Sequence, residues 1–106
     1  MNIAIVDDDK IDLEIAETFL HFYIKKFWAN YEPLIHIETF YSAKDFIQIF
    51  SADLYQLVIL GDSMRKLADF IRARGDYDVK IIFLKLSDNY DNGGGGIDYE
   101  YRHCRR

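Results

Sequence analysis

The chain has 106 residues, half of them hydrophobic, and this length supports one buried core but not two. Its formal net charge of −5 disfavours a general nucleic-acid surface, because the phosphate backbone is bound chiefly by clustered Lys and Arg. No apolar run reaches the roughly 20 residues of a membrane span, and no signal segment is recognisable. We therefore expect residues 1–106 to form a single cytoplasmic domain that contacts neither DNA nor a membrane.

The first predicted element is a buried strand over residues 2–6, an apolar run that ends abruptly at Asp7, Asp8 and Asp9. A long helix follows, and the spacing of Asp9 and Asp12 is typical of a capped helix amino end. The helix carries large aromatic side chains at helical spacing, which we expect to pack in the core or along the helix face: Phe19, Phe22, Tyr23, Phe27 and Trp28.

A second strand and a second helix come next. Residues 30–33 end the first helix, and residues 34–40 alternate in the manner of a strand with two unlike faces. Ser42 is predicted to cap a helix that runs to residue 50, with Asp45 at the third helical position.

Two further strands flank a third helix. Residues 57–60 are uniformly aliphatic, which is typical of a central strand covered on both faces. A helix is predicted over residues 64–74, with Gly75 as its stop, and a buried strand over residues 79–84. This strict alternation of strand and helix predicts a parallel sheet with right-handed crossovers.

The pattern changes after residue 86. Residues 87–96 are polar and end in four glycines, which favours a flexible loop over a helix. Residues 97–106 then provide a short final strand, over residues 97–102, and a tail. Parallel neighbours normally need a crossover helix, so this strand is expected to be antiparallel, or the segment to be disordered. The predicted fold is α/β, with a doubly wound, mostly parallel sheet of four to five strands.

The carboxyl ends of the first and third strands are predicted to flank the point where the strand order reverses, which is where such sheets bind ligands. Asp7 and Asp8 would lie on one side, and Asp62 on the other. Crowded carboxylates are costly unless a cation or a proton intervenes, and Mg²⁺ prefers oxygen ligands. The sequence therefore predicts a magnesium site of Asp7, Asp8 and Asp62, although the acids at residues 7–9 could also serve only to cap the helix.

Three segments together resemble response-regulator receiver domains (CheY-like domains), particularly those of LytTR-type transcription regulators. They are IAIVDDDKIDLEIAE, the strand YQLVIL followed by a turn and Met64, and the strand VKIIFL. The resemblance covers residues 1–84. It implies a flavodoxin-like sheet in the order 2-1-3-4-5 and a role in bacterial two-component phosphorelay signalling. The implied partners are a sensor histidine kinase and an output domain.

The resemblance also implies roles for individual residues. The acidic metal-site pair of the family matches Asp7 and Asp8, with Asp8 the nearer ligand. The phosphate-accepting aspartate of the family falls on Gly61, which has no carboxylate, so an aspartyl phosphate cannot form there. Asp62 is adjacent and is the remaining candidate acceptor. Successive side chains of an extended chain point to opposite sides, so Asp62 is not expected to be a simple substitute.

Two anion-facing positions of the family are altered as well. Lys85 stands where a small hydroxyl residue usually ends the fourth strand. Arg102 stands where a lysine usually ends the fifth strand, and His103 replaces the proline that follows. Both basic side chains are candidates for facing an anion, but a guanidinium does not reproduce a compact ammonium.

Compared with the family, the chain lacks the fourth and fifth helices, so the first helix alone would cover one face of the sheet. Uncovered apolar surface usually binds a partner, and we expect a homodimer or a docked partner domain. Nothing in the sequence resembles a set of catalytic residues, and the leading interpretation is a signalling module that is not an enzyme. The alternatives are a small Mg-dependent phosphatase or phosphotransferase, and a non-switching engineered scaffold.

Overall fold

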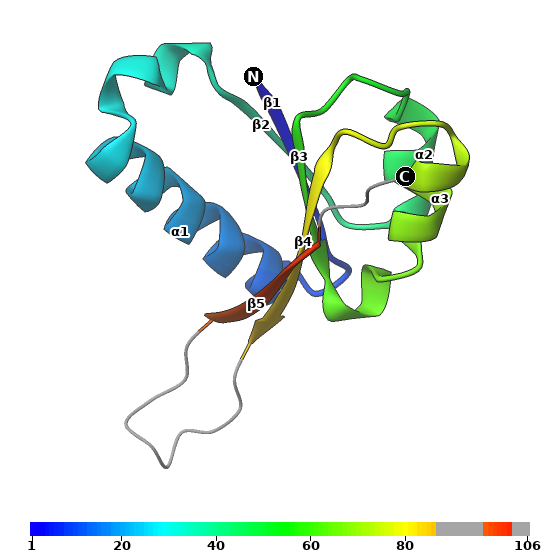
Figure 1. The fold of residues 1–106 in the computed structure, drawn as a ribbon. Helices are drawn as coiled ribbons and strands as arrows, with labels where there is room; N and C mark the ends of the chain where they lie inside the picture. The colour runs from blue at the N-terminus through cyan, green and yellow to red at the C-terminus, as the bar shows by residue number, and fades with distance from the viewer. Residues whose placement is uncertain (87–96, 103–106) are drawn as a thin grey trace.

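The computed structural model describes residues 1–86 and 97–102, and the side chains of residues 1–84. A five-stranded sheet in the order β2-β1-β3-β4-β5 forms its centre (Figure 1). The elements along the chain are β1 (Asn2–Val6), α1 (Lys10–Phe27), η1 (Ala29–Leu34), β2 (His36–Phe40), α2 (Ala43–Ile49), β3 (Leu57–Gly61), η2 (Asp62–Met64), α3 (Leu67–Ala73), β4 (Lys80–Leu86) and β5 (Ile97–Arg102).

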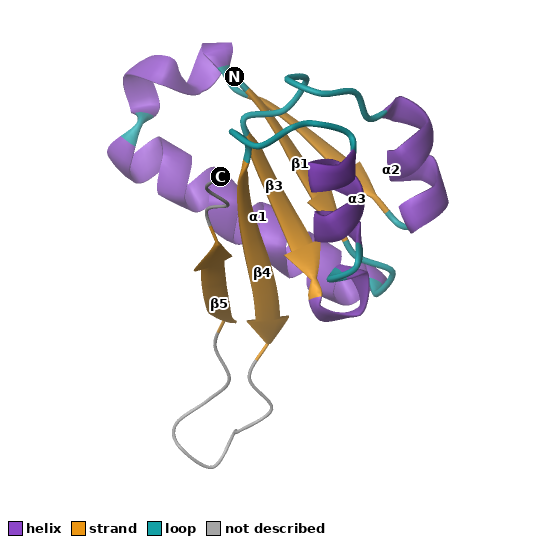
Figure 2. Ribbon diagram, turned by 45° about the vertical axis from the view of Figure 1, so that its right-hand side comes forward, coloured by secondary structure: helices purple, strands orange, loops and turns teal. Residues whose placement is uncertain are grey.

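The first four strands are parallel, and the helices between them lie on both faces of the sheet. α1 covers one face, and α2 and α3 cover the other (Figures 1 and 2). This is a doubly wound α/β fold of the flavodoxin type, which confirms the predicted fold class and strand order.

Each face of the sheet has its own hydrophobic core, and the central strands contribute to both. In β1, Ile3 and Ile5 pack with Leu13 on the α1 side. Ala4 and Val6 belong to the cluster on the α2–α3 side. Because strand side chains alternate between faces, a strand buried on both sides must be apolar at every buried position, as residues Ile3–Val6 of β1 and β3 are.

Side-chain caps begin α1 and α2 as predicted. Asp9 accepts hydrogen bonds from the backbone amides of Ile11, at 2.9 Å, and Asp12, at 3.1 Å. Ser42 accepts one from the amide of Asp45 at 3.1 Å. These caps satisfy amides that have no partner within the helix.

The aromatic stripe of α1 packs along the helix face and not in the core, as the contact between the rings of Tyr23 and Phe27 shows. Leu13, Ala16 and Ile24 are the buried residues of this helix. The 18 residues of α1 span about 27 Å, whereas a strand of five residues spans roughly 17 Å, so the helix extends beyond the sheet. The aromatic residues are all 47% to 63% exposed: Phe19, Phe22, Tyr23, Phe27 and Trp28.

The last strand is antiparallel. Of the two expectations for residues 97–102, an antiparallel strand or a disordered segment, the structure has the first. β5 pairs with β4 so that Ile97 lies opposite Leu86 and Arg102 opposite Ile81. Within the part of the chain that the structure describes, no helix follows α3. The expected Gly-rich loop at residues 87–96 and the tail at residues 103–106 lie outside the described residues.

Candidate functional site

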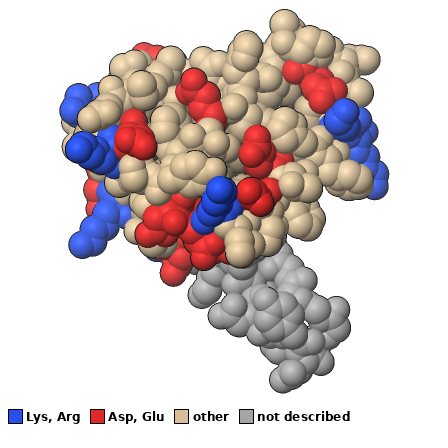
Figure 3. Space-filling view, turned by 180° about the vertical axis from the view of Figure 1, so that it is seen from behind, with Lys and Arg blue, Asp and Glu red and all other residues tan. Residues whose placement is uncertain are grey.

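The carboxyl ends of β1 and β3 form the edge where the sequence predicted a site. The two strands are parallel neighbours, with Val6 opposite Leu60, so Asp7 and Gly61 follow at adjacent strand tips. Asp and Glu side chains gather at the lower edge of the molecule in Figure 3, the end at which these strands terminate. The predicted crowding of acids at this edge is therefore present.

Asp7 is the buried member of this group, with only 5% of its surface exposed. Its Oδ1 accepts a hydrogen bond from the backbone amide of Asp9 at 3.0 Å. The carboxylate lies directly over Gly61: a Cβ added there would overlap Oδ2 and Cγ of Asp7 and lie 2.9 Å from its Oδ1. Gly61 therefore leaves the space that the carboxylate of Asp7 fills.

The surroundings of Asp7 favour its protonated form. Burial raises its pKa above the usual value of 3.8, and the nearby charges of Asp12, Asp8 and Asp9 raise it further. The hydrogen bond from the amide of Asp9 opposes these effects but does not cancel them. Either a proton or a bound cation would relieve the cost of this buried charge.

Asp8 joins the two strand tips directly. Its Oδ1 accepts a hydrogen bond from the hydroxyl of Ser63 at 2.8 Å, across 55 positions of sequence. Sequence reasoning assigned no role to Ser63. The usable signal was its position, because a hydroxyl that follows β3 faces the acids that follow β1 in a parallel pair.

Asp62, the third predicted ligand, is held by a different partner. It begins the short helix η2, and its Oδ1 accepts a hydrogen bond from Nε of Arg65 at 2.8 Å. The guanidinium of Arg65 in turn lies 4.6 Å from the ring centroid of Phe83. The Asp62 side chain is 65% exposed, so its carboxylate faces the surface in an ion pair.

The described residues contain no group of three or more His, Cys, Asp or Glu side chains placed to hold a metal ion. The structure therefore brings Asp7 and Asp8 to one strand tip but does not gather them with Asp62 into a set of three ligands. The predicted magnesium site remains a prediction, and Asp7 and Asp8 are the residues that would form it.

The backbone places the two predicted anion-facing residues at opposite ends of the β4–β5 pair. Lys85 lies near the carboxyl end of β4, opposite Asp98, whereas Arg102 lies opposite Ile81. The four positions between Ile81 and Lys85 correspond to about 13 Å along the strand. Because β5 is antiparallel, the backbone of Arg102 lies away from the carboxyl edge, where a lysine that ends a parallel fifth strand would lie. The side chains of Lys85 and Arg102 lie outside the described part.

A second buried carboxylate, which the sequence did not reveal, lies at the opposite edge of the sheet. Asp76 is 2% exposed and accepts hydrogen bonds from the amides of Asp53, at 3.0 Å, and Val79, at 3.2 Å. Arg72 donates to the carbonyl oxygens of Asp76, at 2.9 Å, and Val79, at 3.0 Å. This network joins the loop before β3 to the loop before β4.

Near the same edge, the hydroxyl of Tyr55 donates a hydrogen bond to the carboxylate of Glu38 in β2. Burial raises the pKa of Tyr55, and the hydrogen bond to Glu38 raises it further. Tyr55 also packs against Phe46 of α2, with ring centroids 6.0 Å apart. The Tyr55 hydroxyl therefore ties the α2–α3 core to the β2 strand and is expected to remain protonated.

Comparisons with known proteins add no identification. The models of known protein families, the curated proteins and the solved structures all give no match to this chain. No helix within residues 1–86 and 97–102 combines the length and apolar character needed to cross a membrane. The resemblance to receiver domains therefore remains an interpretation of the residues themselves.

Proposed function

We propose that this chain is a receiver-like signalling module that acts through contact with other proteins, without an aspartyl phosphate at position 61. The doubly wound fold supports the proposal, because its acidic carboxyl edge lies where such sheets bind ligands. Asp7 and Asp8 follow β1 at this edge, and the resemblance to receiver domains implies the acidic pair at these two positions.

The observation that carries the proposal is the packing of Asp7 onto Gly61. Phosphorylation at position 61 would require a carboxylate on a side chain, and the first carbon of that side chain would overlap Asp7. The space above Gly61 is therefore filled from the β1 side by Asp7, to which the resemblance to receiver domains assigns a role in metal binding. A switch in this chain has to operate by another event, such as binding of a cation or a partner.

Asp62 is a poor replacement for the missing acceptor. Its carboxylate is bound by Arg65 at 2.8 Å and is exposed on η2 instead of lying between the strand tips. A phosphoryl donor bound near Asp8 would have to draw Asp62 away from this ion pair. We therefore expect no stable phosphorylation of Asp62.

Asp7 and Asp8 provide suitable oxygen donors for Mg²⁺. This ion is often bound by one or two carboxylates together with water, so two protein ligands are sufficient in type and number. A bound Mg²⁺ would neutralise the buried charge of Asp7 and would compete with Ser63 for Asp8. Its contribution would be to set the conformation of the loops after β1 and β3.

Intact-mass measurement after incubation with Mg²⁺ and acetyl phosphate tests the proposal. We expect no phosphoryl adduct on the wild-type chain. An adduct of one phosphoryl group that maps to Asp62 and disappears in Asp62→Asn would overturn it. A receiver domain with an intact acceptor aspartate is the positive control, which shows that the donor and buffer are active.

A phosphoesterase assay under the same conditions addresses the enzymatic alternative. We expect no turnover of a generic aryl phosphate above the buffer rate. Ser63 donates a hydrogen bond to Asp8 at this edge, but a carboxylate is a weak base for a serine hydroxyl. Turnover that is lost in Asp8→Asn would contradict the signalling proposal and favour a metal-dependent phosphatase.

A further inference from the structure

We infer that the outer face of α1 binds a second copy of this chain, with the two α1 helices antiparallel. The outer face is defined as the side of α1 that bears Ile11, Ile15, Thr18, Phe19 and Phe22. This inference deepens the proposed function by naming its protein partner, and it rests on that proposal for its biological meaning.

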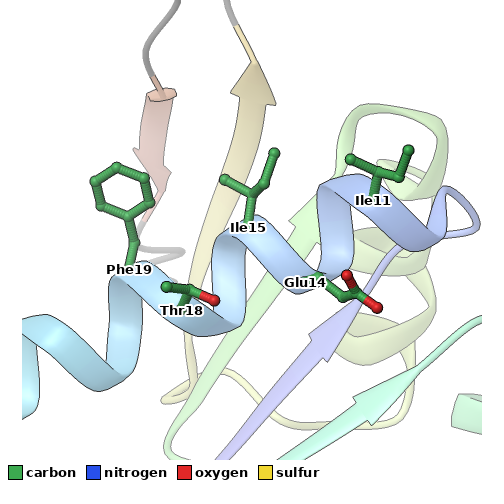
Figure 4. A pocket seen from close by; sticks show the side chains of 5 residues that line it. All are labelled: Ile11, Glu14, Ile15, Thr18 and Phe19. Atoms are coloured by element: carbon green, nitrogen blue, oxygen red, sulfur yellow. The ribbon is translucent and has the colours of Figure 1, made fainter.

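The outer face is apolar and exposed. Ile11 is 67% exposed, Phe19 57% and Phe22 63%, although the opposite side of the same helix buries Leu13 and Ala16 against the sheet. Residues at a spacing of three or four lie on one side of a helix, and Figure 4 shows Ile11, Ile15 and Phe19 projecting from the same side of α1. Together with Glu14 and Thr18 they line a shallow hollow.

The exposed apolar side chains of the outer face set the size of the direct helix–helix contact. A large side chain that is about half exposed offers on the order of 100 Å². Ile11, Phe19 and Phe22 therefore offer roughly 300 Å² on each copy, which is typical of a weak, reversible association. Other exposed apolar side chains lie farther round α1 or after it, outside the outer face: Tyr23, Phe27, Trp28, Tyr31 and Leu34.

The charges along α1 select both the partner and its orientation. The amino-terminal half of the helix is acidic on balance, with Asp12, Glu14 and Glu17 against Lys10, and the carboxyl-terminal half is basic, with Lys25 and Lys26. A helix with this pattern is complementary to an antiparallel copy of itself, because each acidic half then meets a basic half. Antiparallel helix dipoles favour the same arrangement.

A two-fold axis between Thr18 and Phe19 satisfies these requirements. It places Ile15 opposite the partner's Phe22, and Glu14 about one helical turn from the partner's Lys26. Within one chain, Nζ of Lys26 lies 6.0 Å from the ring centroid of Phe22 and 5.5 Å from that of Phe27. Lys26 therefore already borders the apolar face that Glu14 borders at the other end.

Sedimentation equilibrium of the full chain, from about 1 µM to several hundred µM, is the first test. We expect a reversible monomer–dimer equilibrium. We expect Phe22→Lys to weaken association at least tenfold with an unchanged circular dichroism spectrum, because this side chain is 63% exposed. Tyr41→Lys is the matched control, since Tyr41 is 51% exposed but lies after β2, and it should leave association unchanged.

Charge exchange tests the antiparallel geometry. Glu14→Lys and Lys26→Glu should each weaken association about three- to tenfold, because each creates like-charge pairs at both ends of the dimer. The double variant Glu14→Lys/Lys26→Glu restores the opposite-charge pairs and should recover most of the wild-type affinity. An equimolar mixture of the two single variants should associate more strongly than either alone.

Three outcomes would overturn the inference. They are a monomer at the highest concentration, a dimer that Phe22→Lys leaves intact, and binding of the monomer to anionic phosphatidylserine vesicles through the same aromatic residues. Failure of the dimer inference would not change the expected result of the acetyl phosphate experiment, because that experiment tests Gly61 and the acidic edge. The two proposals can therefore fail separately.

Discussion

The sheet carries a buried aspartate at each of its two edges, and the two have opposite surroundings. Asp76, at the amino edge, accepts hydrogen bonds from two backbone amides and lies next to carbonyl groups that Arg72 binds. Asp7, at the carboxyl edge, accepts a hydrogen bond from one backbone amide. Its burial and the charges of three further aspartates raise its pKa. Although both carboxylates are buried, Asp76 anchors two loops through its hydrogen bonds, whereas the charge of Asp7 is only partly balanced by its single hydrogen bond. Incomplete compensation is typical of functional sites.

Removal of each carboxylate gives the largest expected contrast. Asp76→Ala leaves the amides of Asp53 and Val79 without their acceptor and should lower the free energy of unfolding by about 3 kcal/mol. Asp7→Ala removes one acceptor but also an unfavourable buried charge, and should change stability by less than about 1 kcal/mol. Urea unfolding measures both, with Asp76→Asn as an intermediate control. Equal losses in the two alanine variants would contradict the comparison.

The contact between Asp7 and Gly61 can be tested by a double-mutant cycle. Gly61→Ala forces a methyl group against the Asp7 carboxylate and should cost about 1 to 3 kcal/mol. Asp7→Ala removes the obstacle, so the double variant should recover most of this loss.

The matched control for this cycle is Gly75→Ala. Gly75 has a φ of +90° and open space around its Cα, so alanine there should cost about 1 kcal/mol through backbone strain alone. Asp7→Ala should not relieve that cost. If Asp7→Ala restored the stability of both glycine variants equally, it would be a general stabilising substitution, and the proposed contact between Asp7 and Gly61 would be contradicted.

Magnesium should stabilise the carboxyl edge. At a Mg²⁺ concentration a few times the dissociation constant, binding adds about 1 kcal/mol to the free energy of unfolding. We expect the melting temperature to rise by a few degrees with millimolar MgCl₂, and not with NaCl of equal ionic strength. The rise should vanish in Asp8→Asn and persist in Asp62→Asn. Dependence on Asp62 instead of Asp8 would show that the ligand set is different.

The pH dependence gives the smallest expected effect. The pKa of Asp7 is raised in the folded state, so the folded chain binds this proton more tightly than the unfolded chain does. The contribution is fully present below the usual value of 3.8 and is lost as the pH rises through the raised pKa. Asp7→Asn should therefore be more stable than wild type at pH 7.

Urea unfolding of wild type and Asp7→Asn at several pH values between about 3 and 7 measures this effect. The stability difference should shrink toward the acid end of the series. Asp8→Asn is the matched control, because it removes a neighbouring exposed charge and leaves the buried carboxyl in place. A difference between Asp7→Asn and wild type that grows on acidification would mean that the sign for Asp7 is reversed.

Local patterns predicted most of the architecture. The alternation of aliphatic strands with capped helices was sufficient to predict a doubly wound parallel sheet. The strand order was implied by the resemblance to receiver domains. Asp9 and Ser42 cap their helices as their spacing indicated. Each of these signals lies within a few residues along the chain.

The features that the sequence did not predict depend on contacts between distant segments. The position of Ser63 after β3 indicates only that it faces the acids after β1, and not that it bonds Asp8. Nothing near Asp76 indicates that it accepts a hydrogen bond from the amide of Asp53. Helical spacing identified the faces of α1 but could not show that the helix is longer than the sheet it covers. The resemblance matched Arg102 to the end of a fifth strand, but the antiparallel direction of β5 puts its backbone at the other end of the sheet.

The packing of Asp7 onto Gly61 also constrains how this pocket can change by mutation. A single substitution that places an aspartate at position 61 meets the carboxylate of Asp7 and brings a second negative charge beside it. Creating a phosphate acceptor there therefore requires simultaneous changes at two sites, one at position 61 and one that relocates Asp7. Attempts to engineer phosphorylation into this domain should start from such paired libraries, since libraries of single substitutions would miss the productive combinations.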